Sequence, residues 1–462
     1  MPTPSDLFLS PDLTEEHARA YLQSLGFRDP AAVDDDLQRM ADDLVVREAL
    51  GRLAPDLLTA VLESPDPDAA VAAISRYVAS RSGRGMFLDY LREDPRALHV
   101  LTYVMGASPH LADILIRTPE YFHWLVAQVE RSAPDREDHE EELVSAFATI
   151  DDPVEGLNIL RRWRRRETLR IGTRDLLRHE TAQTAGSQLS DVACVAVDFA
   201  LAIVMQQRLD AEARAKPPGT FAVIGTGSLG GREMSYAEDV DLLYVYDTDN
   251  ANGADADGTR EFFVRVGCDL TAALRDETHA GSLYRVQLPA WPHADGWLKA
   301  CSLAEYSAHY AASDDMGERL WLTRARPIAG HAELGAQFMA LCLPFVYRHD
   351  QHNGAAPAPG ESTRAAYDIE ILTQAFQLAH GAQHAALRHT GTLGALDAIA
   401  GAGLIPERVC HELNHAYVFL RAAEHRRQLG LGDADLDKQV QASSARARAL
   451  CAAILQSANP QI

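Results

Sequence analysis

The sequence has little of what marks secreted, disordered or nucleic-acid-binding proteins. Aromatic residues make up 7% of its 462 positions, and 43 Lys and Arg stand against 66 Asp and Glu, a formal net charge of −23. A field of that sign repels a phosphate backbone, so we expect no nucleic-acid partner. The apolar share of 47% and the charged share of 24% are typical of a folded soluble protein rather than a disordered one.

Signals for disulfides, export and membrane insertion are also missing. The six cysteines form no C-x-x-C pair, which predicts reduced thiols. The first residues, MPTPSDLFLSPDL, lack a basic segment followed by an apolar one, so no signal peptide is expected. Asp198 interrupts the longest apolar run, Val192–Met205, which we expect to be too short to span a bilayer. Together these features predict a cytoplasmic protein without a membrane segment.

The periodicity predicts an α+β chain that is predominantly α-helical. At roughly 100–200 residues per domain, the length fits two to four domains. Helical periodicity dominates residues 1–215 and returns in residues 346–462, where a C-terminal helical bundle is expected. Between them, residues 216–345 combine strand-like runs, among them the alternating stretch Ser282–Leu288, with an amphipathic helix at Thr259–Arg275. They predict a small mixed-sheet domain flanked by the helical domains. A Pro-, Gly- and Ala-rich stretch at 349–363 reads as a linker.

The most informative segment is Phe221–Asp247, FAVIGTGSLGGREMSYAEDVDLLYVYD. An apolar strand leads into a Gly-rich turn, and Asp239 and Asp241 open the next apolar strand. Carboxylates at i and i+2 of a strand share a face, and divalent cations such as Mg²⁺ offset their repulsion. Gly227 allows close backbone approach to a phosphate, while Ser228 offers a hydroxyl. The pattern predicts nucleotidyl transfer assisted by two cations.

Two plainer interpretations compete with this hypothesis. An isolated Asp-x-Asp is common at the start of a strand, and only its place after a Gly-Ser turn makes it informative. Gly225, Gly227 and Gly230 also mimic a dinucleotide-binding fingerprint. That fingerprint requires a helix directly after it and an acidic residue about 20 positions on, whereas the Asp239–Asp241 strand arrives sooner. A Rossmann fold is therefore not expected.

The motif Gly227–Glu233, followed by Asp239-Val240-Asp241-Leu242, resembles the signature of the glutamine synthetase adenylyltransferase/adenylyl-removing enzymes. The resemblance extends over roughly residues 60–440. Further segments that carry it are Leu160–Leu177, Leu283–Val286 with Pro292 and Gly296, Gly317–Gly330, Asp368-Ile369-Glu370 with Gln374 and Gln377-Leu378, and Tyr417–Gln428.

This resemblance implies a Mg²⁺-dependent nucleotidyltransferase that uses ATP. Asp239 and Asp241 would be catalytic and bind the metal, and Gly227, Ser228 and Gly230 would bind the nucleotide. The implied protein substrate is glutamine synthetase, on which AMP is attached to a tyrosine or removed by phosphorolysis, and a PII-type signalling protein is a possible further partner. The family fuses two homologous halves, and this chain has the length of one.

Several residues depart from the family pattern. Gln287 stands where the third catalytic Asp is expected, and an amide provides neither a charged metal ligand nor a base. Ser228 replaces a Lys, Glu238 replaces a Ser, and Pro289 and Trp291 replace two arginines. The alternative function is therefore a catalytically degenerate regulatory or scaffold protein in nitrogen signalling. Asp295 and Glu305 are the nearby acids that could replace the third carboxylate.

Other polar residues are more ambiguous. The run Arg161–Arg166 fits a solvated helix face better than a phosphate site. His380 and His384 have an i, i+4 spacing without the Glu of a zinc motif, so ordinary histidines are favoured. Asp368 and Glu370 are expected on a helix, where i and i+2 point in different directions. One of them could orient the nucleotidyltransferase domain or reach the metals, and a plain polar contact between that helix and the domain is an equally supported interpretation.

Overall fold

The computed structural model describes residues 2–248, 256–289, 300–348 and 366–458 of the chain. Their contacts divide into two units. The first comprises residues 1–132, 165–181 and 426–433, and the second comprises 133–164, 182–425 and 434–462. The boundaries predicted near residues 215 and 345 both fall inside the second unit, and that three-part division stays a prediction.

The first unit is built from short helices that begin at polar caps. The side chains of Asp29, Asp43, Asp66 and Asp94 each accept a hydrogen bond from a backbone N–H of the helix that follows. Pro occupies the first turn after three of these caps, where its missing N–H costs nothing. The helices are α1 (Asp6–Leu9), α2 (Glu15–Leu25), α3 (Pro30–Met40), α4 (Leu44–Leu62), α5 (Pro67–Ala79), α6 (Arg84–Glu93), α7 (Pro95–Ala107), α8 (Pro109–Arg117) and α9 (Tyr121–Val129).

Three further helices precede the sheet: α10 (Arg136–Phe147), α11 (Pro153–Leu176) and α12 (Ala182–Ala211). By length and composition, α12 is the one helix in the described ranges that could cross a membrane. The apolar run Val192–Met205 lies inside this 30-residue helix, which is longer than the run on which the expectation of no membrane segment was based. Of its most apolar 18-residue window, 67% is buried inside the protein.

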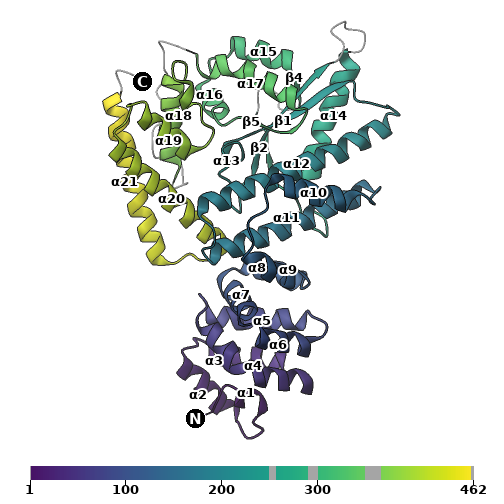
Figure 1. Cartoon of the computed structure of the whole chain (residues 1–462), viewed down its shortest axis with the longest axis vertical. Coiled ribbons are helices and arrows are strands. Elements are labelled where there is room, and N and C mark those ends of the chain that lie inside the picture. Colours follow the sequence, from purple (N-terminus) through teal and green to yellow (C-terminus); the bar gives the residue numbers. More distant parts are fainter. Residues whose placement is uncertain (1, 249–255, 290–299, 349–365, 459–462) are drawn as a thin grey trace. The chain divides into compact units, whose positions relative to one another are not determined.

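A mixed sheet of five strands forms the centre of the second unit (Figure 1). The strands are β1 (Gly219–Thr226), β2 (Val240–Thr248), β3 (Val286–Gln287), β4 (Cys301–Ser302) and β5 (Arg326–Gly330). β1 pairs antiparallel with β2 and with β5, while the short β3 and β4 both pair parallel with β2. The predicted α+β class with a small mixed sheet is confirmed.

Helices cover both faces of this sheet. On one face, Phe221 and Tyr246 stack on Phe263 of α14 (Ala256–Arg275). On the other, Ile224 and Val245 pack in a core with residues of three helices, α15 (Leu303–Ala312), α16 (Met316–Leu322) and α17 (Ala332–Val346). Because both faces are covered, β1 and β2 are apolar along nearly their whole length, and the short helix α13 (Gly227–Gly230) directly follows β1.

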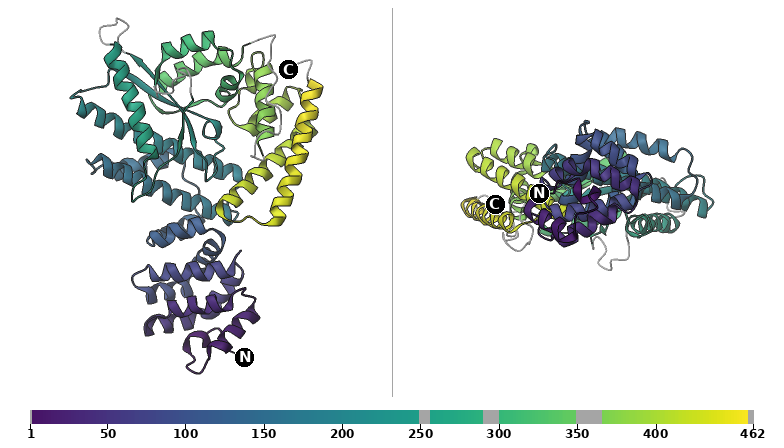
Figure 2. Two further views of the ribbon diagram at one scale, coloured as in Figure 1. Left: turned by 180° about the vertical axis from the view of Figure 1, so that it is seen from behind. Right: turned by 90° about the horizontal axis from the view of Figure 1, so that it is seen from below.

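The C-terminal helices have their own core, which includes Ile369, Leu396, Leu413 and Cys451. The elements are α18 (Tyr367–His380), η1 (Ala385–Leu387), α19 (Thr392–Gly401), α20 (Glu407–Leu429) and α21 (Ala434–Ala458). α20 and α21 run side by side in Figure 1 and in the left view of Figure 2, and an Arg446–Glu412 ion pair joins them. The separate C-terminal bundle expected over residues 346–462 stays a prediction, although the described part of this region is helical.

Three local expectations need correction or fall outside the described ranges. The strand expected over Ser282–Leu288 is reduced to Val286–Gln287, because the N–H groups of Leu283 and Tyr284 both bond to the Leu274 carbonyl at the end of α14. Arg161 does not lie on a solvated face: it is buried, and its guanidinium donates to the Ala273 and Asp276 carbonyls at that same helix end. The whole of the proposed linker, residues 349–363, lies outside the described residues.

Candidate active site

The Gly-rich turn lies against the carboxylate of Asp241. β1 ends at Thr226, whose partner across the antiparallel ladder is Asp241, and Gly227 follows with a φ of +55°. A Cβ at Gly227 would lie 2.1 Å from Asp241 Oδ2, so the Asp241 carboxylate would have to move aside. The left-handed conformation and the close carboxylate both favour glycine here. Two residues predicted for different roles, Gly227 and Asp241, are thus brought together.

Gly230 has a packing role in the same turn. A Cβ at Gly230 would lie 1.9 Å from the Arg324 carbonyl oxygen. Arg326 donates from Nη2 to the Leu229 carbonyl at 3.1 Å and from Nε to the Gly230 carbonyl at 3.3 Å. Arg326 of β5 and the nearby Arg324 backbone therefore fix the end of the turn at Leu229 and Gly230. The nucleotide contact expected of Gly230 stays a prediction.

Ser228 is buried and bonded to an acidic side chain. Its Oγ donates to Glu238 Oε1 at 3.1 Å, and Glu238 Oε2 accepts from the Ser235 N–H at 2.8 Å. Arg421 Nη1 lies 3.4 Å from Glu238 Oε1. Glu238, which departs from the family pattern, therefore joins the turn to the C-terminal helix α20. A phosphate bound by Ser228 would share that hydroxyl with Glu238.

Asp239 precedes β2 and is held by two residues of the β3 segment. Arg285 Nε lies 2.6 Å from Asp239 Oδ1, and Gln287 Nε2 lies 2.9 Å from Asp239 Oδ2. The parallel register places Gln287 opposite Asp241 and Val286 opposite Val240. Gln287 therefore occupies the position beside the aspartate pair that the family resemblance assigns to a carboxylate, and its amide donates to that pair.

The donor set fits a divalent cation in its chemistry. Asp239 and Asp241 supply carboxylate oxygens next to a turn suited to phosphate, and Mg²⁺ prefers one or two carboxylates together with phosphate oxygens. Within the described part of the chain, no third Asp, Glu, His or Cys completes a metal-sized group with them. Glu305 instead closes the capping box at the start of α15, and Asp295 lies outside the described residues. The arrangement expected for two cations stays a prediction.

Behind the turn lies a buried polar cluster that sequence reasoning missed. We call it the Glu233 cluster, and its members are Glu233, Arg324, Glu370, Thr392, Tyr417 and Arg421. Glu233 Oε2 accepts from Arg324 Nη1 at 2.9 Å, Thr392 Oγ1 at 2.9 Å and the Tyr417 hydroxyl at 2.8 Å. Its Oε1 accepts from the Thr392 N–H at 2.6 Å, which satisfies the first turn of α19.

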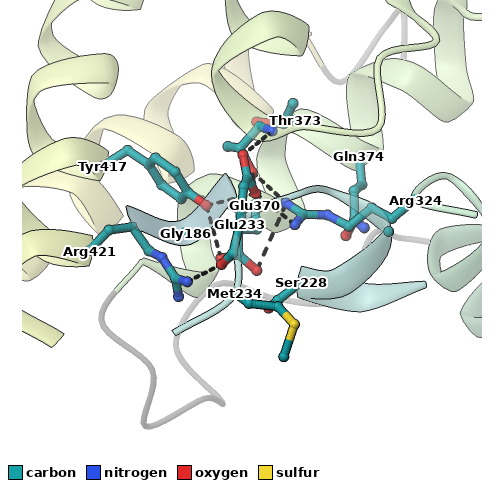
Figure 3. Close-up of polar contacts among 12 residues, drawn as sticks. Gly186, Ser228, Glu233, Met234, Arg324, Glu370, Thr373, Gln374, Tyr417 and Arg421 are labelled. Atoms are coloured by element: carbon teal, nitrogen blue, oxygen red, sulfur yellow. Dashed lines mark hydrogen bonds and ion pairs between the residues drawn. The ribbon is translucent and has the colours of Figure 1, made fainter. Parts of the chain in front are cut away.

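The same cluster balances two arginines against two carboxylates. Glu370 Oε2 lies 4.0 Å from Arg324 Nη2, and the Tyr417 hydroxyl lies 3.5 Å from Glu370 Oε1. Arg421 donates to the Glu233 backbone carbonyl and pairs with Glu424. Figure 3 shows both carboxylates between Tyr417 and Arg421 on one side and Arg324 on the other.

Burial and charge act against each other on the titration of this cluster. Burial alone would lower the pKa of Arg324, but Glu233 and Glu370 raise it above its ordinary value. Burial raises the pKa of the Tyr417 hydroxyl, and the same two carboxylates raise it further. Arg324 is therefore charged and Tyr417 is neutral, which lets the tyrosine donate its proton to Glu233.

Four of the segments that resemble the family contribute to this cluster. Glu233 ends the Gly-rich motif, Arg324 precedes Ala-Arg-Pro, and Glu370 ends Asp-Ile-Glu. Tyr417 and Arg421 belong to the segment Tyr417–Gln428 of α20. The other acid of the Asp-Ile-Glu segment, Asp368, points elsewhere and pairs with Arg448 of α21 at 2.9 Å. The sequence did offer a signal, because each of these motif segments carries a charged residue. No pattern in the sequence indicated that these residues meet in one cluster.

A cavity of about 210 Å³ opens beside the cluster. Glu233, Tyr417 and Arg421 reach it from two sides, and its surface is mainly apolar. The remaining lining residues are Ala182, Gln183, Gly231, Arg232, Gly391, Leu393, Gly394 and Val418. The cavity touches the end of the Gly-rich motif, but neither Asp239 nor Asp241 lines it.

Comparison with protein families gives two matches. Residues 98–341, more than half of the chain, match the family described as glutamate-ammonia ligase adenylyltransferase. Residues 367–438 match the family described as GlnD PII-uridylyltransferase. The first range holds β1 to β5 with the Gly-rich turn, and the second holds Glu370, Thr392, Tyr417 and Arg421 of the Glu233 cluster.

Curated relatives match nearly the full chain. A bifunctional glutamine synthetase adenylyltransferase/adenylyl-removing enzyme of Chromobacterium violaceum is 28% identical over 98% of this chain and 53% of its own length. Proteins of the same name from Thioalkalivibrio sulfidiphilus and Streptomyces avermitilis are 29% and 30% identical over 92% and 87% of this chain. The chain spans about half the length of the curated relatives it matches.

Proposed function

The chain belongs to the glutamate-ammonia ligase adenylyltransferase family, and from that premise we propose that it transfers AMP between ATP and a tyrosine of a protein substrate. Glutamate-ammonia ligase, which is glutamine synthetase, is the proposed substrate, as the names of the relatives suggest. The observation that carries the proposal is the direct contact between the Gly227 turn and the Asp241 carboxylate. A nucleotide phosphate on that turn would lie next to a carboxylate.

In the forward direction, the tyrosine oxygen of the substrate attacks the α-phosphorus of ATP. The bond between the α- and β-phosphates breaks, pyrophosphate leaves, and the tyrosine proton is lost to solvent or a base. In the reverse direction, an oxygen of inorganic phosphate attacks the phosphorus of the tyrosine-bound AMP. The bond between that phosphorus and the tyrosine oxygen breaks, ADP forms, and the tyrosine oxygen recovers its proton. Mg²⁺ on Asp239 and Asp241 would stabilise the negative charge that develops on the phosphate oxygens.

The protein groups have separate proposed roles. The turn at Gly227, Ser228 and Gly230 binds the phosphates through its N–H groups and the Ser228 hydroxyl. Asp241 and Asp239 bind the cation. The Glu233 cluster positions the turn relative to the C-terminal helices. We place the reaction in the cytoplasm, and the match of residues 367–438 makes a PII-type signalling protein a candidate regulator.

The test incubates the purified chain with Mg²⁺, ATP labelled on the α-phosphate and glutamine synthetase. We expect label on the synthetase, and we expect Asp241→Asn to abolish it. Asp247→Asn is the matched control, because it makes the same change further along β2 and should leave labelling intact. The reverse arm supplies adenylylated synthetase with phosphate and measures ADP.

A second function has one specific observation in its favour. Gln287, which faces Asp241 across the β2–β3 ladder, supplies an amide where a third carboxylate is expected. A chain that keeps nucleotide binding without transfer would serve as a regulatory or scaffold protein in nitrogen signalling. Calorimetry with Mg-ATP separates the two functions: binding without labelling or ADP release in either arm supports regulation, whereas labelling that Asp241→Asn abolishes supports the enzyme.

A further inference from the structure

Both oxygens of Asp239 already have a donor from the protein. Arg285 holds Oδ1 at 2.6 Å and Gln287 holds Oδ2 at 2.9 Å. Gln287 must present its nitrogen to Asp239, because a carboxylate only accepts and the amide oxygen would be repelled. The β3 segment thus supplies one positive charge and one amide N–H to the Asp239 carboxylate. A divalent cation bound at this carboxylate would take over the same role.

We infer that Arg285 and Gln287 compete with a divalent cation for Asp239, so that the chain weakens cation binding at its own active site. The inference rests on the proposed function, since it concerns the cation of that same site. A guanidinium 2.6 Å from Oδ1 repels an approaching dication, and the amide N–H occupies the other oxygen. Asp239 Oδ1 becomes available to the cation when Arg285 withdraws, while the Gln287 amide continues to occupy Oδ2.

The two competitors differ in strength. The Arg285 side chain is 77% exposed, and it also donates to the Ala237 carbonyl at 3.4 Å. Exposed ion pairs of this kind contribute little stability and are screened by salt. Gln287 is tied to the β2–β3 ladder, and the register keeps its amide beside the two aspartates. Arg285 is therefore the displaceable competitor and Gln287 the fixed one.

A substitution at Gln287 has a defined consequence in this geometry. In Gln287→Asp, a third carboxylate would stand opposite Asp241, and the donor to Asp239 Oδ2 would be lost. Three neighbouring carboxylates repel one another unless a cation lies among them, so this variant should gain affinity for the metal. Arg285→Ala removes a positive charge without adding a ligand, and a smaller gain is expected.

The experiment measures Mn²⁺ affinity by titration, counting free Mn²⁺ by electron paramagnetic resonance, without nucleotide or protein substrate. Asp241→Asn defines the background from the acidic surface. We expect Arg285→Ala to tighten binding about two- to fivefold and Gln287→Asp to tighten it about tenfold or more. The gain from Arg285→Ala should disappear when Asp239→Asn is added, because that competition acts through the Asp239 carboxylate. Arg265→Ala, which removes another exposed arginine, this one on α14, should change nothing.

The outcomes separate the inference from the proposed function. Measurable wild-type binding that Arg285→Ala leaves unchanged or weakens would overturn the competition while the proposed function stands. An Arg285→Ala gain that survives Asp239→Asn would also overturn it, since the effect would then be general electrostatics. If neither the wild type nor any variant, Gln287→Asp included, binds Mn²⁺ above the Asp241→Asn background, both the competition and the cation-dependent function fail.

Discussion

Arg324 Nη1 lies 2.9 Å from Glu233 Oε2, although the two residues are 91 positions apart. Their side chains are 6% and 15% exposed, so the pair is removed from most solvent. Glu233 also accepts from Thr392 of α19 and Tyr417 of α20. The Glu233 carboxylate thus joins the end of the Gly-rich motif to the segment before β5 and to the C-terminal helices.

Replacing the carboxylate of this pair should destabilise the fold. In Glu233→Gln, Arg324 keeps its buried charge and loses its main counter-ion. Breaking a buried pair from one side costs about 3–5 kcal/mol of unfolding free energy. Urea denaturation followed by circular dichroism measures the change. Glu261→Gln, which breaks the exposed Arg265–Glu261 pair on α14, should cost less than about 1 kcal/mol. Equal losses in the two variants would show that the Glu233 cluster is not a stabilising centre.

Gly227→Ala should impair nucleotide binding more than stability. The new Cβ would overlap Asp241 Oδ2, so the carboxylate must move away from the turn. We expect Mg-ATP affinity, measured by calorimetry, to fall at least about tenfold, the loss of one charged ligand contact.

Gly281→Ala is the control for backbone strain. Gly281 also has a positive φ, +89°, but a Cβ there meets no atom within 4 Å. This variant should lose about 1 kcal/mol of stability and keep its affinity for Mg-ATP. If both variants bind Mg-ATP like the wild type, the contact between the turn and Asp241 does not serve the nucleotide.

Asp198 of α12 gives a prediction of pH dependence. Burial raises the pKa of this carboxyl, although the Gly330 N–H bonded to its Oδ1 at 2.9 Å lowers the pKa in part. A carboxyl whose pKa is raised by folding favours the folded state at low pH, and this contribution is lost as the pH rises through the raised pKa.

Asp198→Asn should therefore stabilise the protein at neutral pH. The amide oxygen still accepts from Gly330, and no charge is buried. We expect the melting temperature to rise by a few degrees at pH 7. The difference should shrink as the pH falls through the raised pKa toward about 4, where an unfolded aspartate protonates. A difference that is the same at pH 4 and pH 7 would contradict this explanation.

Thiol labelling should single out Cys268. Cys194, Cys301, Cys342, Cys410 and Cys451 are buried, and Cys268 is partly exposed on α14. Burial raises the pKa of Cys301 to about 12 and that of Cys410 to about 11, which suppresses their thiolates. At pH 8, Ellman's reagent should react quickly with one thiol of the native protein, and Cys268→Ser should remove that phase. Rapid reaction of several thiols would show that the core opens readily.

The sequence was sufficient for the features that depend on local patterns. The strands around the Gly-rich turn and the helix at Thr259–Arg275 were predicted because apolar periodicity and glycine conformation act over a few residues. The register that sets Gln287 opposite Asp241 was not predicted, since β3 forms only two residue pairs with β2 and the alternation of Ser282–Leu288 suggested a longer strand.

The Glu233 cluster escaped prediction for a different reason. Its partners come from segments up to 188 positions apart, and no short-range pattern reports which buried charges will meet. Arg161 shows the same limit. An arginine run on a helix suggests a solvated face, yet Arg161 is buried because the carbonyls at the end of α14 need donors.

The Glu233 cluster also limits how this region can be divided. A polypeptide ending after β5 would keep Glu233 and Arg324 but lose Thr392, Tyr417 and Arg421, which cap and neutralise them. The strands and the late helices are therefore expected to fold cooperatively and to be inherited together. Exchanging the late helices with those of another protein would require that protein to supply matching donors at the same three positions.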